Sequence, residues 1–210
     1  MPKIKICGLS REEDIDYANE AAPDYIGFVF APSKRQVSAA RAERLRARLM
    51  DGIVPVGVFV DAPSGDIAAL HRAGIIAVAQ LHGGEDEAYI ERLKELCAVP
   101  VIKAVKLGEA AGRDEAARLA RGGATRADFL LFDSGAGSGV PFDRSALPSL
   151  LSGKSPPVFI AGGINVSTIE EIVKYQPFGV DVSSGAETGG VKDRGKVLRL
   201  VKATRLAPRA

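Results

Sequence analysis

The sequence predicts a closed (β/α)₈ barrel in which residues 1–210 form a single domain. Eight short, apolar, β-branched runs recur along the chain, and an amphipathic stretch rich in Ala, Leu, Arg and Glu separates each run from the next. Eight is the number of β-α units that closes a barrel. An open, doubly wound sheet is the alternative, but the first run is followed by CGLSREED rather than by a glycine-rich dinucleotide fingerprint.

The predicted strands are nearly continuous apolar segments, as expected when both faces of a strand are buried. In chain order they are 3–7 (KIKIC), 25–30 (YIGFVF), 54–60 (VPVGVFV), 77–82 (AVAQLH), 101–105 (VIKAV), 128–133 (DFLLFD), 158–161 (VFIA) and 180–183 (VDVS). Between them, 39–50 (AARAERLRARLM) and 90–97 (IERLKELC) carry apolar residues at helical spacing and predict helices. No linker or charge block interrupts the series.

Composition excludes several classes of protein. With 46% hydrophobic and 26% charged residues the chain is of globular type, and a net charge of +2 lacks the field of a nucleic-acid or anionic-membrane binder. No apolar run approaches the ~18 residues of a membrane helix. Two widely separated cysteines, Cys7 and Cys97, indicate a reducing compartment, and we expect a cytoplasmic protein. Two histidines, His71 and His82, cannot assemble a multi-histidine metal site, so we expect no metal.

Polar residues gather where the predicted strands end. In a (β/α)₈ barrel the loops after the strands build the catalytic face. Cys7 ends the first strand, His82 the fourth and Asp133 the sixth. Because side chains alternate along a strand, all three can point into the mouth of the barrel.

Two glycine-rich turns predict a phosphate site. The seventh and eighth strands lead into AGGINVST and VSSGAE, and a barrel commonly holds phosphate with the loops at these two positions. Gly163, Ser183, Ser184 and Gly185 are the candidate phosphate-binding residues. Taken singly, each turn is more simply an ordinary tight β-α connection, but two such turns on adjacent strands favour the phosphate site.

Cys7 and Asp133 predict a pair of proton-transferring groups. Lys5 shares a strand face with Cys7, and its ammonium would favour the thiolate; alternatively, Lys5 forms an ion pair with Asp181 inside the barrel. Asp133 follows the apolar FLLF, so we expect burial to raise its pKa and to make it a proton donor near neutral pH, unless it only caps a turn.

Arg35 and His82 are candidate substrate-binding residues. A guanidinium reaching over the mouth from Arg35 would pair bidentately with a carboxylate or phosphate, although a solvated loop charge is the simpler interpretation. His82 is a second candidate, with a purely structural histidine as its alternative.

Motifs along nearly the whole chain resemble the phosphoribosylanthranilate isomerase family. They are KICGLS, GFVFAPSKRQVS, VGVFVD, QLHGGE, LLFD with GAGSGVPFD, FIAGGINVSTIEEI and GVDVSSGAETGGVKD, and they span residues 3–193. The resemblance implies a cofactor-free barrel that performs an Amadori rearrangement, with Cys7 as general base and Asp133 as general acid. It also implies that Arg35 lies near the anthranilate carboxylate, and that Gly163 and residues 183–185 bind the phosphate. Ala136 and Arg144 depart from the family pattern in the loop after the sixth strand.

Two competing functions follow from the same residues. One is another phosphosugar isomerase of barrel fold, of the histidine-pathway aminoaldose type, which uses paired aspartates where this chain has Cys7. The other is a non-catalytic phosphate-binding barrel, which would need neither Cys7 nor Asp133. In each case we expect a small phosphorylated ligand as partner, no nucleic acid or membrane, and a monomer or homodimer.

Overall fold

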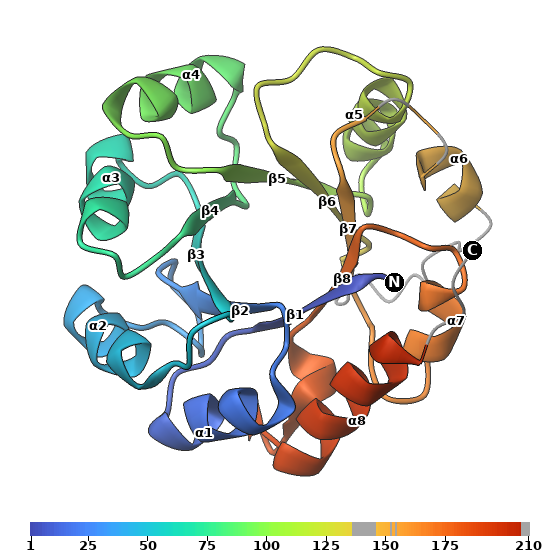
Figure 1. Ribbon diagram of the computed structural model, residues 1–210. Coiled ribbons are helices and arrows are strands. Elements are labelled where there is room, and N and C mark those ends of the chain that lie inside the picture. The colour runs from blue at the N-terminus through green and yellow to red at the C-terminus, as the bar shows by residue number, and fades with distance from the viewer. Residues whose placement is uncertain (136–145, 152, 154, 207–210) are drawn as a thin grey trace.

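Eight parallel strands close into a barrel in the computed structural model, which describes residues 1–135, 146–151, 153 and 155–206 (Figure 1). The strands are β1 (Lys3–Cys7), β2 (Tyr25–Val29), β3 (Val54–Phe59), β4 (Val78–Leu81), β5 (Val101–Lys106), β6 (Phe129–Asp133), β7 (Val158–Ala161) and β8 (Gly179–Val182). Each pairs with the next, and β1 pairs with β8 to close the ring. The predicted fold class is confirmed, and no strand end differs from its predicted range by more than one residue.

Helices cover the outside of the ring. They are α1 (Glu12–Ala21), α2 (Ala39–Arg48), α3 (Ser64–Arg72), α4 (Glu87–Leu96), α5 (Ala110–Ala120), α6 (Leu147–Leu151), α7 (Ile169–Val173) and α8 (Arg194–Arg205). The helix predicted at 90–97 begins earlier, at Glu87, because the Asp86 carboxylate caps it by accepting from the Tyr89 amide at 2.8 Å. Between β8 and α8 lie a short 3₁₀ turn (Ser184–Ala186) and an antiparallel hairpin of β9 (Glu187–Thr188) and β10 (Val191–Lys192).

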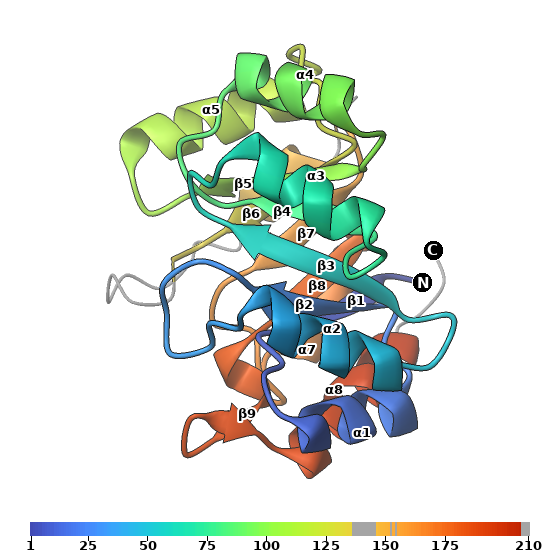
Figure 2. The ribbon, with the colours of Figure 1, turned by 90° about the vertical axis from the view of Figure 1, so that its left-hand side faces the viewer.

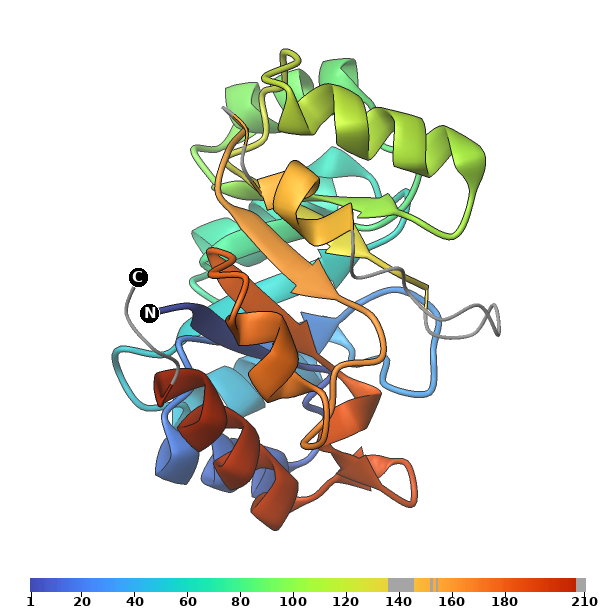
Figure 3. The same cartoon turned by 90° about the vertical axis from the view of Figure 1, so that its right-hand side faces the viewer.

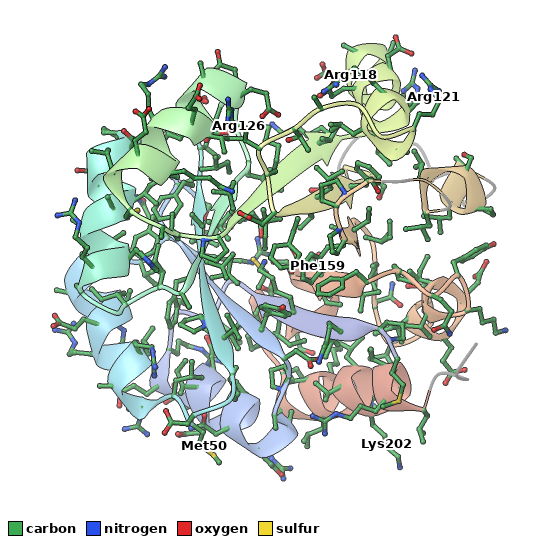
Figure 4. All side chains as sticks on the ribbon, turned by 45° about the horizontal axis from the view of Figure 1, so that its top comes forward. Met50, Arg118, Arg121, Arg126, Phe159 and Lys202 are labelled. Carbon is green, nitrogen blue, oxygen red and sulfur yellow. The ribbon has the colours of Figure 1, made fainter. Side chains whose placement is uncertain are left out.

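Strand alternation produces two apolar layers. Side chains that point outward, such as Ile4, Ile6 and Phe28, are fully buried against the helices. Those that point inward form a smaller cluster inside the barrel. Phe159 lies within the ring of strands (Figure 4), with its ring 5.1 Å from Phe178 and 5.4 Å from Tyr25. These partners lie at or before the strand starts, so aromatic rings fill the amino-terminal end of the barrel.

The carboxyl ends of the strands all lie on one side of the molecule. In Figure 3 the arrowheads point to the right, where the β9–β10 hairpin and the β2–α2 connection project, and the N-terminus lies at the opposite end. Figure 2 shows the same face on the left. The interior is therefore apolar at the amino-terminal end and open to polar loops at the other. Within the described residues, no helix is long and apolar enough to cross a membrane.

Candidate active site

A cavity of about 310 Å³ opens at the carboxyl ends of the strands. Its walls are formed by Cys7, Arg35, Val58, Gln80, His82, Asp133, Gly135, Ala161, Gly162, Gly163, Ile164, Asp181, Ser183 and Ser184. Seven of the eight residues selected from the sequence are among them. Gly185 is the exception, because it lies behind the cavity wall, against the loop after β7.

Cys7 reaches the cavity floor from the end of β1. A glycine on the neighbouring strand makes room for it: a Cβ at Gly27 would lie 2.7 Å from the Cys7 Sγ. The thiol is buried, and burial raises its pKa more than the Lys5 ammonium lowers it. Lys5 does lower the pKa of Cys7, as expected, but desolvation of the anion outweighs the nearby positive charge, so the thiol is favoured in the free protein.

Lys5 forms the ion pair that the sequence offered as an alternative. Its Nζ lies 2.9 Å from Asp181 Oδ1, and its side chain is fully buried. Burial alone would lower the pKa of Lys5, but the carboxylate of Asp181 and the thiol of Cys7 outweigh it and raise the pKa. Because Asp181 neutralises much of the Lys5 charge, less of it acts on Cys7.

Asp133 is held as a carboxylate. Its Oδ2 lies 3.3 Å from His82 Nε2, and its Oδ1 accepts from the Gly135 amide at 2.9 Å. Burial would raise the pKa of Asp133, but these two donors outweigh it and lower the pKa below its ordinary value. The predicted raised pKa is therefore wrong. Gly162 makes space here, since its Cβ would lie 2.9 Å from Asp133 Oδ1 and its φ of +93° suits glycine.

His82 directs both ring nitrogens at protein groups. Nε2 faces Asp133, and Nδ1 lies 3.0 Å from the amide nitrogen of Gln80. An imidazole has only these two polar atoms, so the ring face and edge remain for a bound ligand. Gln80 itself is 1% exposed, and within the described residues its Oε1 is buried without a hydrogen-bond partner.

Arg35 makes the bidentate carboxylate pair that was predicted for it, but with a residue of this chain. Its Nε and Nη2 donate to the two carboxylate oxygens of Glu187 on β9 at 2.6 and 2.7 Å. Lys192 on β10 donates to the same carboxylate and, at 3.1 Å, to the Ser183 carbonyl. Among the described residues, Arg35 Nη1 has no hydrogen-bond partner, and this nitrogen remains for an incoming anion.

The loops after β7 and β8 meet at the remaining side of the cavity. Gly163, Ser183 and Ser184 line it. The Ser183 hydroxyl donates to the Cys7 carbonyl at 3.3 Å, which joins the ends of β8 and β1. A Cβ at Gly185 would lie only 1.9 Å from the Ile164 carbonyl oxygen, so glycine lets the two loops pack directly together.

Sequence reasoning missed several residues of this site. Gln80, Glu187 and Lys192 were not selected from the sequence. GAETGGVKD carried the signal for the last two, because a charged pair flanks a glycine turn directly after the loop predicted to bind phosphate. Ala136 and Arg144, the departures from the family pattern, lie outside the described residues. Within the described part of the chain, no group of three potential metal ligands is found.

Comparison with known proteins identifies one family. Its model, N-(5'phosphoribosyl)anthranilate (PRA) isomerase, matches residues 4–203. An N-(5'-phosphoribosyl)anthranilate isomerase of Endomicrobium trichonymphae is 47% identical, over 98% of this chain and 99% of that protein.

Solved structures agree with this match. Phosphoribosyl anthranilate isomerase from Thermus thermophilus superposes with a TM-score of 0.82 at 32% identity, covering 97% of this chain and 98% of that one. A phosphoribosyl anthranilate isomerase in complex with reduced 1-(o-carboxyphenylamino)-1-deoxyribulose 5-phosphate has a TM-score of 0.83 at 29% identity, covering 98% and 99%.

Proposed function

This chain belongs to the N-(5'-phosphoribosyl)anthranilate isomerase family of tryptophan biosynthesis, and we propose that Cys7 is the general base and Asp133 the general acid of its reaction. The observation that carries this assignment is one cavity holding a thiol on β1 and a carboxyl group on β6. The reaction converts N-(5'-phosphoribosyl)anthranilate to 1-(2-carboxyphenylamino)-1-deoxyribulose 5-phosphate, an aldose-to-ketose isomerisation.

The chemistry needs one proton donor and one proton acceptor. Asp133 protonates the furanose ring oxygen as the C1–O bond breaks, and the nitrogen lone pair forms the C1–N double bond. The Cys7 thiolate then removes the C2 proton, the C2–H electron pair forms the C1–C2 double bond of an enolamine, and the π pair of the C1–N double bond returns to nitrogen. Transfer of the 2-hydroxyl proton to C1 yields the ketone. Each positioned proton transfer typically contributes ~10²–10⁴-fold to the rate.

Two anionic ends of the substrate match two parts of the cavity. The loops that carry Gly163 and residues 183–185 suit the phosphate, because backbone and hydroxyl groups meet there without a carboxylate. Arg35 Nη1 suits the anthranilate carboxylate, and His82 lines the same cavity against Asp133. Support comes from the relative bound to the reduced phosphorylated product analogue. Binding both ends holds the labile sugar between Cys7 and Asp133.

Replacing the two groups one at a time tests their roles. We expect Cys7→Ala and Asp133→Asn each to lower kcat/KM by about 10² or more. The assay monitors the loss of anthranilate-type fluorescence from freshly made substrate. Circular dichroism of both variants should match that of the unchanged protein. Cys97→Ala is the matched control, because the second cysteine ends α4 away from the cavity. Near-normal turnover in either site variant would remove that residue from its role.

The same preparation tests the association state. We keep the expectation of a monomer or homodimer, which sedimentation of the intact chain distinguishes.

A further inference from the structure

We propose that His82, held by Gln80, resupplies the proton that Asp133 gives to the substrate, so that the three side chains act as one proton relay. The inference rests on the assignment of Asp133 as the general acid. His82 and Gln80 act through Asp133, and they are therefore positioning residues.

The need for a relay follows from the contacts of Asp133. A general acid must carry a proton, yet His82 Nε2 at 3.3 Å and the Gly135 amide at 2.9 Å both favour the ionised carboxylate. Held by these two donors, Asp133 is a poorly loaded acid unless a neighbouring group supplies its proton. Imidazole is the side chain that ordinarily gains a proton near neutral pH, and here it lies directly against the carboxylate.

Gln80 keeps a proton on the side of His82 that faces Asp133. When the Gln80 amide N–H donates to Nδ1, a neutral imidazole carries its proton on Nε2. When the imidazole is doubly protonated, the amide turns over and Oε1 accepts from Nδ1–H. Gln80 Oε1, buried and unpartnered within the described residues, gains its hydrogen bond in this second state. A glutamine serves both states because its amide offers a donor and an acceptor.

Other charged groups surround the relay without contacting the ring nitrogens of His82. They are Cys7, Arg35 and Asp181 in the cavity walls, Lys106 at the end of β5, and Asp61, Glu85 and Lys103 beside the loop after β4. Glu85 accepts from the Asp61 and Gly83 amides at 2.8 Å, and Lys103 donates to the Gly83 carbonyl at 3.0 Å. These contacts hold the backbone next to His82, while Asp133 is the charged partner of its ring.

The proton balance is closed. The imidazolium Nε2–H bond breaks as the Asp133 O–H bond forms, and Nδ1–H then donates to Gln80 Oε1. The Asp133 O–H bond breaks as the proton moves to the furanose ring oxygen. Solvent then returns one proton to the imidazole, and Cys7 releases to solvent the proton it took from C2. No oxidant, reductant or further reactant is required.

His82→Gln and Gln80→Met test the relay. The glutamine of His82→Gln can still donate to Asp133 but cannot titrate, so we expect kcat to fall about tenfold or more while KM changes little, and the basic limb of the kcat–pH profile to move. In Gln80→Met, kcat should fall less, and the ¹⁵N resonance of His82 Nδ1 should shift because its hydrogen bond to Gln80 is lost. The chain has only two histidines, and His71→Gln is the matched control, since His71 on α3 bonds the Ile76 carbonyl.

The outcomes separate this inference from the assignment of Asp133. An active Asp133→Asn variant overturns the assignment itself. If Asp133→Asn is inactive while His82→Gln keeps the kcat and pH profile of the unchanged protein, the relay alone is wrong. Should His82→Gln fold poorly, the ¹⁵N spectrum of folded Asp133→Asn decides: loss of the carboxylate must change the resonance of His82 Nε2, and an unchanged spectrum overturns the relay.

Discussion

Cys7 and Asp133 rest in the protonation states opposite to those that the reaction uses. Burial raises the pKa of the Cys7 thiol, and the His82 and Gly135 donors hold the pKa of Asp133 low. The base is therefore protonated and the acid ionised in the free protein at neutral pH. The reactive form is a minor one, which the bound substrate or a neighbouring group must stabilise.

Lys5 contributes both to the free energy of unfolding and to the pKa of Cys7. Its buried pair with Asp181 loses one partner in Lys5→Met, and removing half of a buried ion pair typically costs about 3–5 kcal/mol. We expect a free energy of unfolding lower by about that amount in urea titrations. The pKa of Cys7 should rise further without the ammonium, which moves the acid limb of kcat/KM to higher pH.

A double variant provides the control. In Lys5→Met combined with Asp181→Leu no charge remains unpaired, so the double variant should be more stable than Lys5→Met alone. Equal or lower stability would show that the pair contributes through packing rather than charge.

At the scale of elements, the β9–β10 hairpin positions a residue that belongs to the β2–α2 connection. Glu187 on β9 holds Arg35, although 152 positions separate them in the sequence. Lys192 on β10 is buried and joins the same carboxylate to the end of β8. The hairpin thus holds in place a residue of the cavity wall, Arg35.

Glu187→Gln should weaken binding and alter acid stability. Arg35 loses a charge-assisted pair, so we expect KM to rise about tenfold, the equivalent of one such hydrogen bond. Arg35 and Lys192 outweigh burial and lower the pKa of Glu187. Its stabilising contribution is therefore present above the unfolded-state pKa of ~4.3 and is lost as the pH falls through the lower folded-state pKa. Urea midpoints between pH 6 and 3 should fall further in the unchanged protein than in Glu187→Gln.

Glu115→Gln is the comparison for this acid dependence. Arg118 also lowers the pKa of Glu115, but that pair lies exposed on α5 and is screened by water. Glu115→Gln should change the pH dependence of the urea midpoint less than Glu187→Gln does. An equal change would contradict the stabilising role assigned to the Glu187 pair in the hairpin.

The contact between the loops after β7 and β8 predicts a glycine requirement. In Gly185→Ala the added Cβ would meet the Ile164 carbonyl at 1.9 Å, so one loop must move. Displacement of the proposed phosphate site should raise KM, and the inhibition constant of inorganic phosphate, about ten- to a hundredfold.

Gly65→Ala in α3 is the matched variant. Its Cβ meets no atom within 4 Å, so activity should stay unchanged, and stability should rise slightly if at all. An unaltered KM in Gly185→Ala would mean that the phosphate binds elsewhere.

At the scale of the whole molecule, the barrel separates stability from chemistry along its axis. Aromatic side chains fill the amino-terminal end, and titratable groups line the carboxyl end. Phe159→Ala removes a fully buried ring that contacts Tyr25, Phe129 and Phe178, so we expect a loss of about 3–5 kcal/mol in the free energy of unfolding. Turnover of the folded fraction, assayed well below the melting temperature, should remain within about twofold. A parallel loss of kcat would show that the two ends are coupled.

Most of the fold could be predicted from the chain alone. The repeating apolar runs define the strands to within one residue, since a strand buried on both faces needs a continuous apolar segment. Strand alternation and the barrel rule then place Cys7, His82 and Asp133 at one mouth. Gln80, Glu187 and Lys192 escaped prediction because their importance lies in their partners, which local patterns do not identify.

The order of elements, the closed barrel and the residues at its strand ends were determined by the sequence itself, because they follow from local periodicity and from the number of units that closes a ring. Only the tertiary structure decided the protonation of Cys7 and Asp133 and the partner of Arg35. A pKa depends on burial and on charges a few ångströms away, and in Lys5–Asp181 those charges come from residues 176 positions apart. Chain folding alone brings such groups together.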